Sequence, residues 1–326
     1  MKAFHVLLAT GALVLSVACS GVYAQAKPAP VSMTLNWYPQ ADHGGYFAAK
    51  AEGIYEKYGL DVTLRPGGPQ VNVHQLLAAG QTDFIMGTQM RALNARSQGI
   101  PIVSVAAWYQ KDPQTILVHE GSGNDSLAAL KGKTIYLPGI ARTNYWPWLK
   151  VKFGLSDDQI KPYDPSFRAL ALDKTAASQG YLTNDAWQMA KLGAKAKSLL
   201  LADYGWGAYV STLDATDKTV AEKPEVVRAF VRATSEGWKR YLANPAPAHA
   251  LIKQMNPQQE DELMNVSYRI MREAGLLESG DAKGGRIGVM TDARWDAFYK
   301  EMVAAGALPP NVELKKTYTL QFMKDI

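Results

Sequence analysis

The feature that most constrains the fold is an alternation of strand-like and helix-like segments that begins at residue 31. Residues 31–37 and 60–64 alternate apolar and polar side chains, as a half-buried strand does. Between them, residues 44–58 carry apolar side chains at helical spacing, and Gly59 is typical of a helix end. Because parallel strands need a crossover connection, this alternation predicts an α/β domain built on a parallel sheet.

A turn-rich break over 121–126 separates two such runs, so the 326 residues suggest two domains. Before the break, the pattern predicts further helices over 71–79 and 89–98 and strands over 84–86, 102–107 and 115–119. After it, we expect helices over 127–130, 143–153, 169–179 and 186–192 and strands over 134–137, 199–201 and 208–212. The rest is predicted to be mostly helical, with helices over 224–243, 260–274 and 293–304.

The N-terminus predicts an export signal. Lys2 precedes an apolar run over 6–18, which is too short to span a bilayer comfortably, and small residues follow. Residues 22–24 fit the small-residue cleavage rule, so we expect a signal peptide over 1–24 and a periplasmic protein. A lipoprotein attached through Cys19 is less favoured, because Ser16 stands where such signals usually carry a large aliphatic residue.

Composition excludes several classes of protein. The chain is 47% hydrophobic and 20% charged, which rules out bulk disorder. The net charge of +5 is spread along the chain and gives no nucleic-acid footprint. Cys19 is the only cysteine, and cleavage would leave no disulfide or thiol nucleophile. The histidines lack metal-ligand spacing, and no hydrolase, zinc or phosphate-loop motif occurs, so we expect no metal and no cofactor.

Short segments in a fixed order resemble a known family. They include Asn36 to Pro39, His43 to Ala49, Glu52 to Val62, Pro66 to Asn72, Leu77 to Phe84, Leu130 to Lys133, Gly180 to Asp185, and Gly288 to Thr291 with Arg294 and Trp295. Over some 290 residues this order is similar to that of ABC-importer substrate-binding proteins. The branch is the thiamine-pyrimidine-synthase-like (NMT1-type) family of type II periplasmic binding proteins.

The resemblance implies two α/β lobes, joined by two crossing strands, with a ligand cleft between them. We expect residues 31–118 and 209–326 to form lobe 1 and residues 119–208 to form lobe 2. The crossings would lie near 115–120 and 208–212.

Ligands of open α/β sheets bind at the carboxyl ends of strands and the N-termini of the next helices. Aromatic side chains recur in those loops, where a flat ring could be clamped by stacking. Arg142 is a cation at a predicted helix start and could hold a carboxylate or phosphate, and Asp185 could accept from a ring amine, as could Asp42. The candidate ligand-binding residues are Asn36, Trp37, Tyr38, His43, Tyr46, Thr88, Gln89, Trp108, Arg142, Thr143, Asn144, Tyr145, Asn184, Asp185 and Trp206.

The predicted function is an exported solute receptor that captures a flat nitrogen heterocycle, such as a thiamine-precursor pyrimidine or a flavin, by hinge closure. Its expected partners are the ligand and the permease subunits of an ABC importer, and we expect a monomer. The alternatives are an anionic solute held by Arg142, such as a sulfonate, taurine or an aromatic carboxylate, and a sensor that signals without import.

An enzyme is the least favoured class. In the related synthases a lysine forms the cofactor Schiff base, a nearby histidine is consumed and a cysteine-rich run binds iron. The resemblance places Gly87 and Arg91 at the lysine and histidine positions, and residues 205–212 contain no cysteine.

Overall fold

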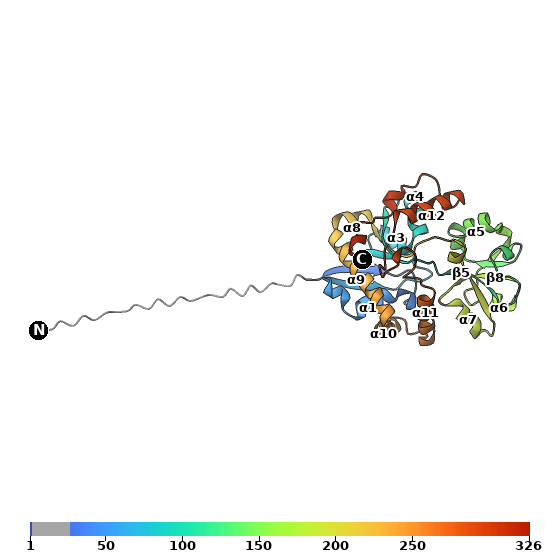
Figure 1. Ribbon diagram of the computed structural model, residues 1–326, viewed down its shortest axis with the longest axis horizontal. Coiled ribbons are helices and arrows are strands. Elements are labelled where there is room, and N and C mark those ends of the chain that lie inside the picture. Colours follow the sequence, from blue (N-terminus) through green and yellow to red (C-terminus); the bar gives the residue numbers. More distant parts are fainter. Residues whose placement is uncertain (2–26) are drawn as a thin grey trace.

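The computed structural model describes residue 1 and residues 27–326, so the expected signal peptide and Cys19 lie outside the described residues. Over residues 27–326 the chain forms two five-stranded sheets. Each sheet carries its own helices, and the two units lie side by side as a larger and a smaller lobe (Figure 1). The two-lobed α/β architecture predicted from the sequence is confirmed.

Lobe 1 is built on a mixed sheet in the order β2-β1-β3-β10-β4. Strand β1 runs parallel to β2 and β3, as the predicted parallel sheet requires, whereas β10 is antiparallel to β3 and β4, so the sheet as a whole is mixed. Every residue of β4 is buried, because α4, α9 and α13 all pack against it. The strands are β1 (Ala29–Thr34), β2 (Leu60–Arg65), β3 (Phe84–Thr88), β4 (Ile102–Tyr109) and β10 (Val210–Thr216).

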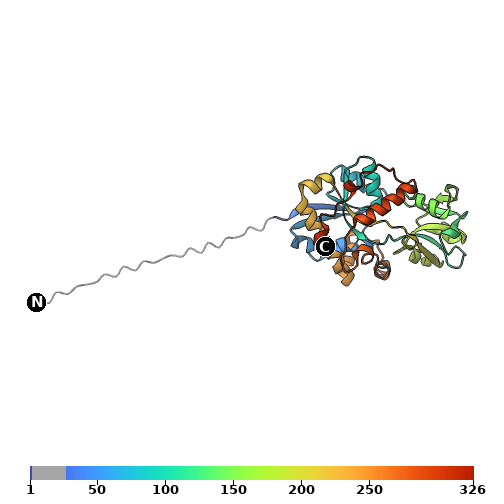
Figure 2. The same cartoon turned by 45° about the horizontal axis from the view of Figure 1, so that its top comes forward.

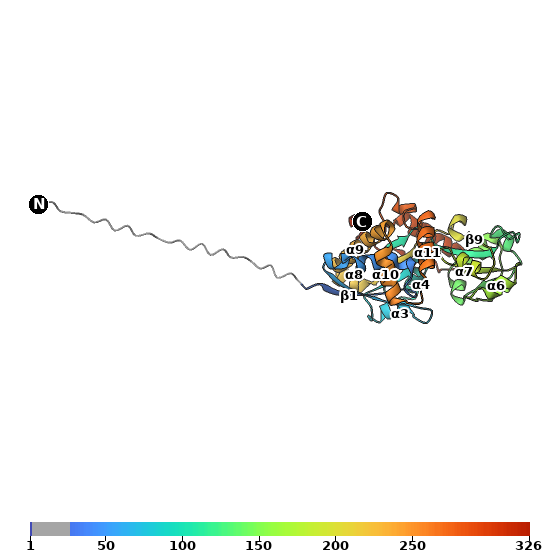
Figure 3. The same ribbon diagram turned by 90° about the horizontal axis from the view of Figure 1, so that it is seen from below.

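The helices of lobe 1 come from both ends of the chain. Figure 3 shows α8, α9 and α10 gathered on this lobe, away from α6 and α7 of the other. They are α1 (Gly44–Ala51), α2 (Ile54–Lys57), α3 (Val73–Ala78), α4 (Gln89–Ser97), α8 (Asp217–Glu222), α9 (Pro224–Ala243), α10 (Ala246–Met255), α11 (Asp261–Glu273), α12 (Asp292–Ala304) and α13 (Leu314–Thr317). Short 3₁₀ helices are η1 (Ala41–His43), η6 (Gly280–Ala282) and η7 (Met323–Asp325).

Lobe 2 has the sheet order β7-β6-β8-β5-β9, in which β6 is parallel to β7 and β8 and β5 is antiparallel to β8 and β9. Its strands are β5 (Gln114–His119), β6 (Ile135–Leu137), β7 (Ile160–Pro162), β8 (Ala177–Tyr181) and β9 (Ala196–Leu200). Its helices are α5 (Trp146–Phe153), α6 (Arg168–Leu172) and α7 (Asp185–Lys191), with 3₁₀ helices η2 (Ala128–Leu130), η3 (Gly139–Thr143), η4 (Asp157–Gln159) and η5 (Leu201–Tyr204).

Within the described chain, two segments connect the sheets: residues 110–113 join β4 to β5, and residues 201–209 join β9 to β10. We call them the first and second connections. Residues 114–118 pair with β8 and β9, so they belong to the second sheet and not, as expected, to lobe 1. The first crossing expected at 115–120 therefore lies earlier, because the strand there completes the lobe 2 sheet.

Two helices expected from the sequence are not continuous. The segment 44–58 breaks into α1 and α2 at Gly53, whose φ of 67° leaves the helical region. The helix expected over 169–179 ends at Leu172, and residues 177–181 instead form β8. Strand β8 lies between β5 and β6, so tertiary pairing overrides the helix propensity of an alanine-rich stretch.

The lobe 1 core forms where α9 crosses α1. The inward residues predicted for α9, namely Val227, Phe230, Val231, Thr234 and Trp238, are all buried. Gly44 and Gly45 of α1 lie against the rings of Tyr241 and Trp238, where a Cβ atom would overlap them. This close approach places the N-terminus of α1, and η1 before it, at the edge of the sheet that faces lobe 2.

Candidate ligand site between the lobes

Asp42 marks a direct contact between the two lobes. It lies in η1, which follows β1 in the chain, and its Oδ1 accepts a hydrogen bond of 2.9 Å from Thr183 Oγ1 of lobe 2. The carbonyl oxygen of Thr183 in turn accepts from Ser267 Oγ of α11 at 2.7 Å. The loop before α7 is therefore held between two elements of lobe 1.

Further contacts join the lobes around this point. Asn94 Nδ2 of α4 donates to the Thr143 carbonyl at 3.4 Å, and Lys191 of α7 pairs with Glu260 at 2.7 Å. Trp148 Nε1 of α5 donates to Glu301 Oε1 of α12 at 2.6 Å. Figure 2 shows α12, in red, extending from the larger lobe toward the green smaller lobe. These contacts define a closed arrangement of the lobes.

Three buried carboxyl groups converge on this interface. Asp42, Asp112 and Asp185 are 3%, 7% and 5% exposed. Asp112 lies in the first connection and accepts from Trp206 Nε1 of the second connection at 2.8 Å. Asp185 begins α7 and accepts from the backbone N–H of Tyr181. Burial raises the pKa of the Tyr181 hydroxyl, and the negative charges of all three carboxyl groups raise it further. The closed interface therefore carries a concentration of hydrogen-bond acceptors.

Burial shifts the ionisation of these carboxyl groups toward neutral pH. It raises the pKa of Asp42 and of Asp112 to about 6, although hydrogen bonds to each carboxylate act in the opposite direction. The pKa of Asp185 rises to about 7, because burial is reinforced by the negative charge of Asp42. Burying these charged acceptors costs free energy, and a hydrogen bond from an N–H donor that enters between the lobes would offset part of that cost.

Four further buried polar atoms, on elements of both lobes, have no hydrogen-bond partner: His43 Nδ1, Gln89 Nε2, Thr115 Oγ1 and Tyr145 OH. His43 Nε2 donates to Asn36 Oδ1 at 3.0 Å, which leaves Nδ1 as an acceptor, and burial lowers the imidazole pKa to about 3. Gln89 Oε1 accepts from Tyr209 N at 2.8 Å, which leaves Nε2 as a free donor. Each unpaired buried group costs about 1–3 kcal/mol, so the set points to a bound partner.

Trp37 and Tyr38 form an exposed aromatic pair after β1. They are 43% and 51% exposed, and their rings meet edge to face at 5.7 Å. The loop is fixed by Gly67, whose N–H donates to the Trp37 carbonyl at 3.0 Å. A Cβ atom at Gly67 would overlap the Leu35 carbonyl, so only glycine allows the two loops to approach this closely. Large apolar surface exposed in pairs at a sheet edge is typical of a binding surface.

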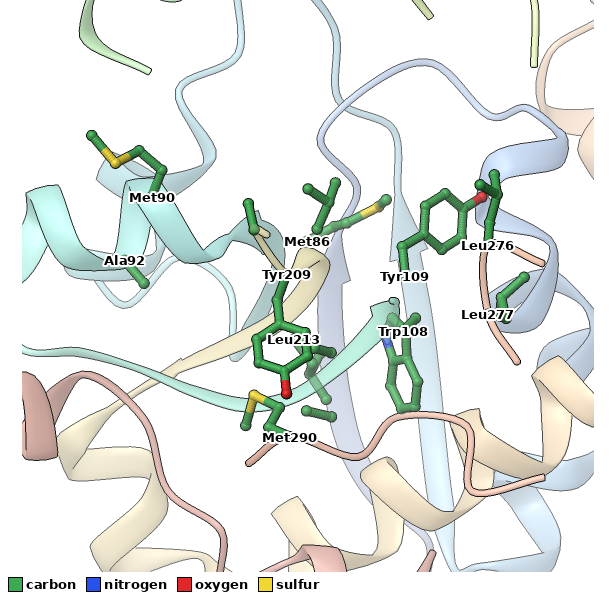
Figure 4. Close-up of a cluster of buried hydrophobic side chains, with 14 of the residues drawn as sticks. Met86, Met90, Ala92, Trp108, Tyr109, Tyr209, Leu213, Leu276, Leu277 and Met290 are labelled. Atoms are coloured by element: carbon green, nitrogen blue, oxygen red, sulfur yellow. The ribbon is translucent and has the colours of Figure 1, made fainter. Parts of the chain in front are cut away.

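Tyr46 and Trp108, both predicted to bind ligand, lie instead in the lobe 1 core. Both are fully buried, and Trp108 Nε1 donates to Tyr46 OH at 2.6 Å. Figure 4 shows Trp108 in the hydrophobic cluster with Tyr109, Leu276 and Leu277. Packing and this hydrogen bond account for both side chains, so we leave them out of the proposed site.

Trp206 and Tyr145 contact each other near the connections. Their ring centroids are 6.4 Å apart, and Trp206 also packs against Phe298 of α12 at 5.1 Å. The indole N–H of Trp206 is already satisfied by Asp112, whereas the Tyr145 hydroxyl is free. Tyr145 is therefore the better placed of the two to reach a ligand.

The remaining predicted site residues have local roles or lie on the surface. Thr88 caps α4 by accepting from Arg91 N at 3.3 Å, and Asn184 Oδ1 accepts from Gln188 Nε2 at 2.9 Å. Arg142 and Thr143 are exposed in η3, and Asn144 follows them half-buried. Arg142 is thus not placed among the buried groups, which leaves the anionic alternative without its expected cation at this interface.

Three residues of the interface were absent from the predicted site: Asp112, Thr115 and Thr183. Asp42 was expected only as a possible acceptor, and it lies in a loop that the strand-end rule selects. Asp112 and Thr115 lie in and just after the first connection, whose place depends on how the two sheets pack. No local pattern in the sequence marks them.

The chemistry of the related synthases does not fit this site. Gly87 stands at the expected lysine position, and a Cβ atom there would overlap the buried carboxylate of Asp214 and lie against Thr212 Oγ1. Within the described residues, no cluster of three or more His, Cys, Asp or Glu side chains could hold a metal ion. Nor does any helix in that part of the chain have the length and apolar character needed to cross a membrane.

The fold is that of the two-lobed type II periplasmic binding proteins. The sulphonate-binding protein SsuA of Escherichia coli superposes with a TM-score of 0.67 at 14% identity, over 89% of this chain and 92% of SsuA. The family model described as "NMT1/THI5 like" matches residues 40–248, and the chain belongs to that family.

Two relatives bind solutes. The riboflavin-binding protein RibY of Chloroflexus aurantiacus is 26% identical over 91% of this chain and 89% of its own. The formylaminopyrimidine-binding protein of Halalkalibacterium halodurans is 28% identical over 76% of this chain and 78% of its own. A 4-amino-5-hydroxymethyl-2-methylpyrimidine phosphate synthase of Saccharomyces cerevisiae is 25% identical over 73% of this chain and 75% of its own. With the binding-protein fold and the misfit at Gly87, these similarities favour a solute-binding receptor of the ABC-importer type over an enzyme.

Proposed function

We propose that this protein is an exported receptor that captures a flat nitrogen heterocycle, of the flavin or aminopyrimidine type, and delivers it to an ABC importer. The observation that carries the proposal is the buried interface between the lobes, which holds the carboxyl groups of Asp42, Asp112 and Asp185 and, near Asp112, the unpaired hydroxyl of Tyr145. Relatives that bind riboflavin and formylaminopyrimidine support the same class of ligand.

The polar groups match the edge of such a ring. Ring N–H and amino groups would donate to the carboxylates of Asp42 and Asp185, which lie on opposite lobes. Ring nitrogens or carbonyl oxygens would accept from Gln89 Nε2 or Tyr145 OH, and His43 Nδ1 offers one more acceptor. Hydrogen bonds to charged groups contribute about 1.5–3 kcal/mol each, so a few suffice for selective binding.

The apolar faces of the ring would stack on aromatic side chains. Trp37 and Tyr38 project from lobe 1, and Tyr145 belongs to lobe 2. Because a ligand between them contacts both lobes only when the lobes are closed, binding shifts the population toward the closed state. The closed receptor, a monomer in the periplasm, would then dock on the permease. An anion, in contrast, would meet three carboxylates that repel it.

Intrinsic tryptophan fluorescence and calorimetry test the ligand class directly. Titration with riboflavin or with 4-amino-5-hydroxymethyl-2-methylpyrimidine should give saturable binding, whereas taurine, an alkanesulfonate and nitrate should give none. Binding of a sulfonate or nitrate without binding of any heterocycle would refute the proposal. Mass spectrometry of compounds that co-purify with the protein identifies the ligand independently.

Two variants place the ligand at the interface. Trp37→Ala should weaken binding by about 1–3 kcal/mol through lost stacking, and Asp185→Asn should weaken it through the loss of a charged acceptor. The matched controls are Leu172→Ala, which alters an apolar side chain that is 88% exposed, and Glu120→Gln, which alters an exposed carboxylate of lobe 2. Equal losses in variants and controls would place the ligand elsewhere.

A further inference from the structure

Arg294 contacts both connections between the lobes. It lies in the first turn of α12, where Thr291 caps the helix by accepting from Arg294 N at 3.4 Å. Its Nη2 donates to the carbonyl oxygen of Gln110 at 2.5 Å, and its Nε donates to the carbonyl oxygen of Gly207 at 2.8 Å. Gln110 opens the first connection and Gly207 lies in the second, so one guanidinium group joins segments almost 100 residues apart.

The Arg294 guanidinium group donates further hydrogen bonds to the same two connections. Nη2 also donates to the Ala208 carbonyl at 3.2 Å, and Nη1 donates to Gln110 Oε1 at 3.2 Å. The amide of Gln110 is itself anchored to lobe 1, since its Nε2 donates to the carbonyls of Ala107 and Val289 at 3.3 and 3.0 Å. A planar guanidinium suits this geometry because its donors point in fixed directions.

Neighbouring groups hold the guanidinium in place. It stacks on the ring of Tyr209, 4.1 Å from the ring centroid, and its Nη1 lies 3.7 Å from Asp281 Oδ2. The Tyr209 hydroxyl donates to the same Asp281 carboxylate and accepts from Thr291 N at 3.0 Å. The Arg294 side chain is 19% exposed, so these interactions are only partly screened by solvent. The ligand-facing groups at the interface are not among its hydrogen-bond partners.

The three backbone carbonyl groups that Arg294 joins lie at the lobe 1 ends of the connections. Bending between the lobes must occur in residues that are free to change φ and ψ. With Gln110 and residues 207–208 fixed to α12, and residues 201–204 held in η5, that freedom is left to residues 111–113 and 205–206. The closing motion is thereby restricted to a narrow set of paths.

We propose that Arg294 is a positioning residue for lobe closure: it fixes the lobe 1 ends of both connections together and so sets the closed geometry in which ligand is held. The proposal rests on the proposed function, because it assumes that ligand is bound by closure. It also gives a role to the Arg294-Trp295 segment, which the ligand site itself leaves unexplained.

The test measures the distance between the lobes without ligand. Spin labels are placed on Leu172→Cys of lobe 2 and Glu225→Cys of lobe 1, side chains that are 88% and 82% exposed, in a Cys19→Ser background. Arg294→Gln should broaden the ligand-free distance distribution. It should also weaken binding of riboflavin or the aminopyrimidine about tenfold, mainly through faster release. Arg294→Lys should show a smaller change of the same kind, because one ammonium group cannot reach both connections.

Arg286→Gln is the matched control, since Arg286 also donates to a backbone carbonyl, that of Met323, at 3.3 Å, but not to a connection. An unchanged distribution in folded Arg294→Lys, or equal broadening in Arg286→Gln, overturns the proposal. The distance measurement needs no ligand. Broadening without binding of either heterocycle would therefore support the role of Arg294 while refuting the proposed ligand class.

Discussion

At the scale of single residues, Asp214 shows what a buried carboxyl group imposes on its surroundings. It lies in β10 and is fully buried, with its Oδ1 accepting from Ser104 Oγ at 2.7 Å. Its Oδ2 has no hydrogen-bond partner, and it fills the space beside Gly87 where a side chain would otherwise lie. Burial raises the pKa of Asp214 to about 6, from 3.8 for a free carboxyl group.

Ionised Asp214 should therefore destabilise the folded state at neutral pH. A pKa that is higher in the folded than in the unfolded chain means that the folded chain binds more protons between pH 4 and 6. Stability must then fall as the pH rises through that window. The cost above pH 7 is about 3 kcal/mol, from about 1.4 kcal/mol per pKa unit.

Asp214→Asn should remove this cost while keeping the acceptor for Ser104. Urea unfolding should show the variant to be more stable than the wild type at pH 8 and nearly equal to it at pH 4. Comparing the two chains cancels the contributions of other carboxyl groups, and Asp61→Asn, whose side chain is 70% exposed, should follow the wild type. A stability difference that does not vary with pH would contradict the assignment.

The site residues illustrate how far single positions can be predicted from the sequence. His43 and Gln89 follow predicted strands in an α/β pattern, and the strand-end rule selects them without any structure, whereas Asp185 follows β8, a strand that the sequence did not predict. Trp108 follows the same rule, yet its ring points into the core, because strand β4 is buried along its whole length. Alternation of apolar and polar residues shows which side of a strand is buried only when the other side faces solvent. Since β4 is buried on both sides, the sequence pattern could not predict where the Trp108 side chain points.

At the scale of elements, the packing of α1 on α9 depends on small residues. Gly45 lies against the ring of Trp238, and Gly237 of α9 lies against the Gly45 carbonyl. The helical segments themselves were predictable: α9 was expected over 224–243 and forms over Pro224–Ala243. The close packing of α1 against α9 was not predictable, because a glycine within a helix does not indicate from the sequence which residues it will contact. The strand β8 was missed for a similar reason, because its pairing partners are distant in the sequence.

Gly45→Ala should therefore test this helix contact. Its Cβ atom would overlap Trp238, and relief requires the helices to separate, so we expect a loss of about 1–3 kcal/mol in unfolding free energy. Gly139→Ala is the control, because Gly139 has no atom within 4 Å of its Cβ position. Chemical denaturation of both variants measures the difference. Equal stability of Gly45→Ala and Gly139→Ala would show that α1 and α9 can adjust without cost.

At the scale of the whole molecule, closure brings like charges together. Asp42 of lobe 1 and Asp185 of lobe 2 are both buried, and the charge of Asp42 helps to raise the pKa of Asp185 to about 7. Opening the lobes would hydrate both groups and lower those pKa values. Under the proposed function, an empty closed receptor carries an electrostatic penalty that a ligand with N–H donors would relieve, and this would couple ligand binding to closure.

The fraction of closed protein should depend on pH, because the open and closed forms bind different numbers of protons. Because the carboxyl pKa values are higher in the closed than in the open form, closing takes up protons, and lower pH favours the closed form. The neighbouring imidazole of His43 opposes this trend, since burial lowers its pKa to about 3 and opening would raise it. Its effect begins only near pH 6.5, whereas Asp185 titrates from about pH 7.

Between pH 8 and pH 6.5, the closed fraction of the ligand-free protein should thus rise, as measured with spin labels on Leu172→Cys and Glu225→Cys. Asp185→Asn removes the repulsion, so it should be more closed than the wild type at pH 8 and nearly insensitive to pH in this range. Glu120→Gln should behave as the wild type, because its carboxylate is exposed on lobe 2. A wild-type distance distribution that does not change over this range would show that Asp42 and Asp185 do not control closure.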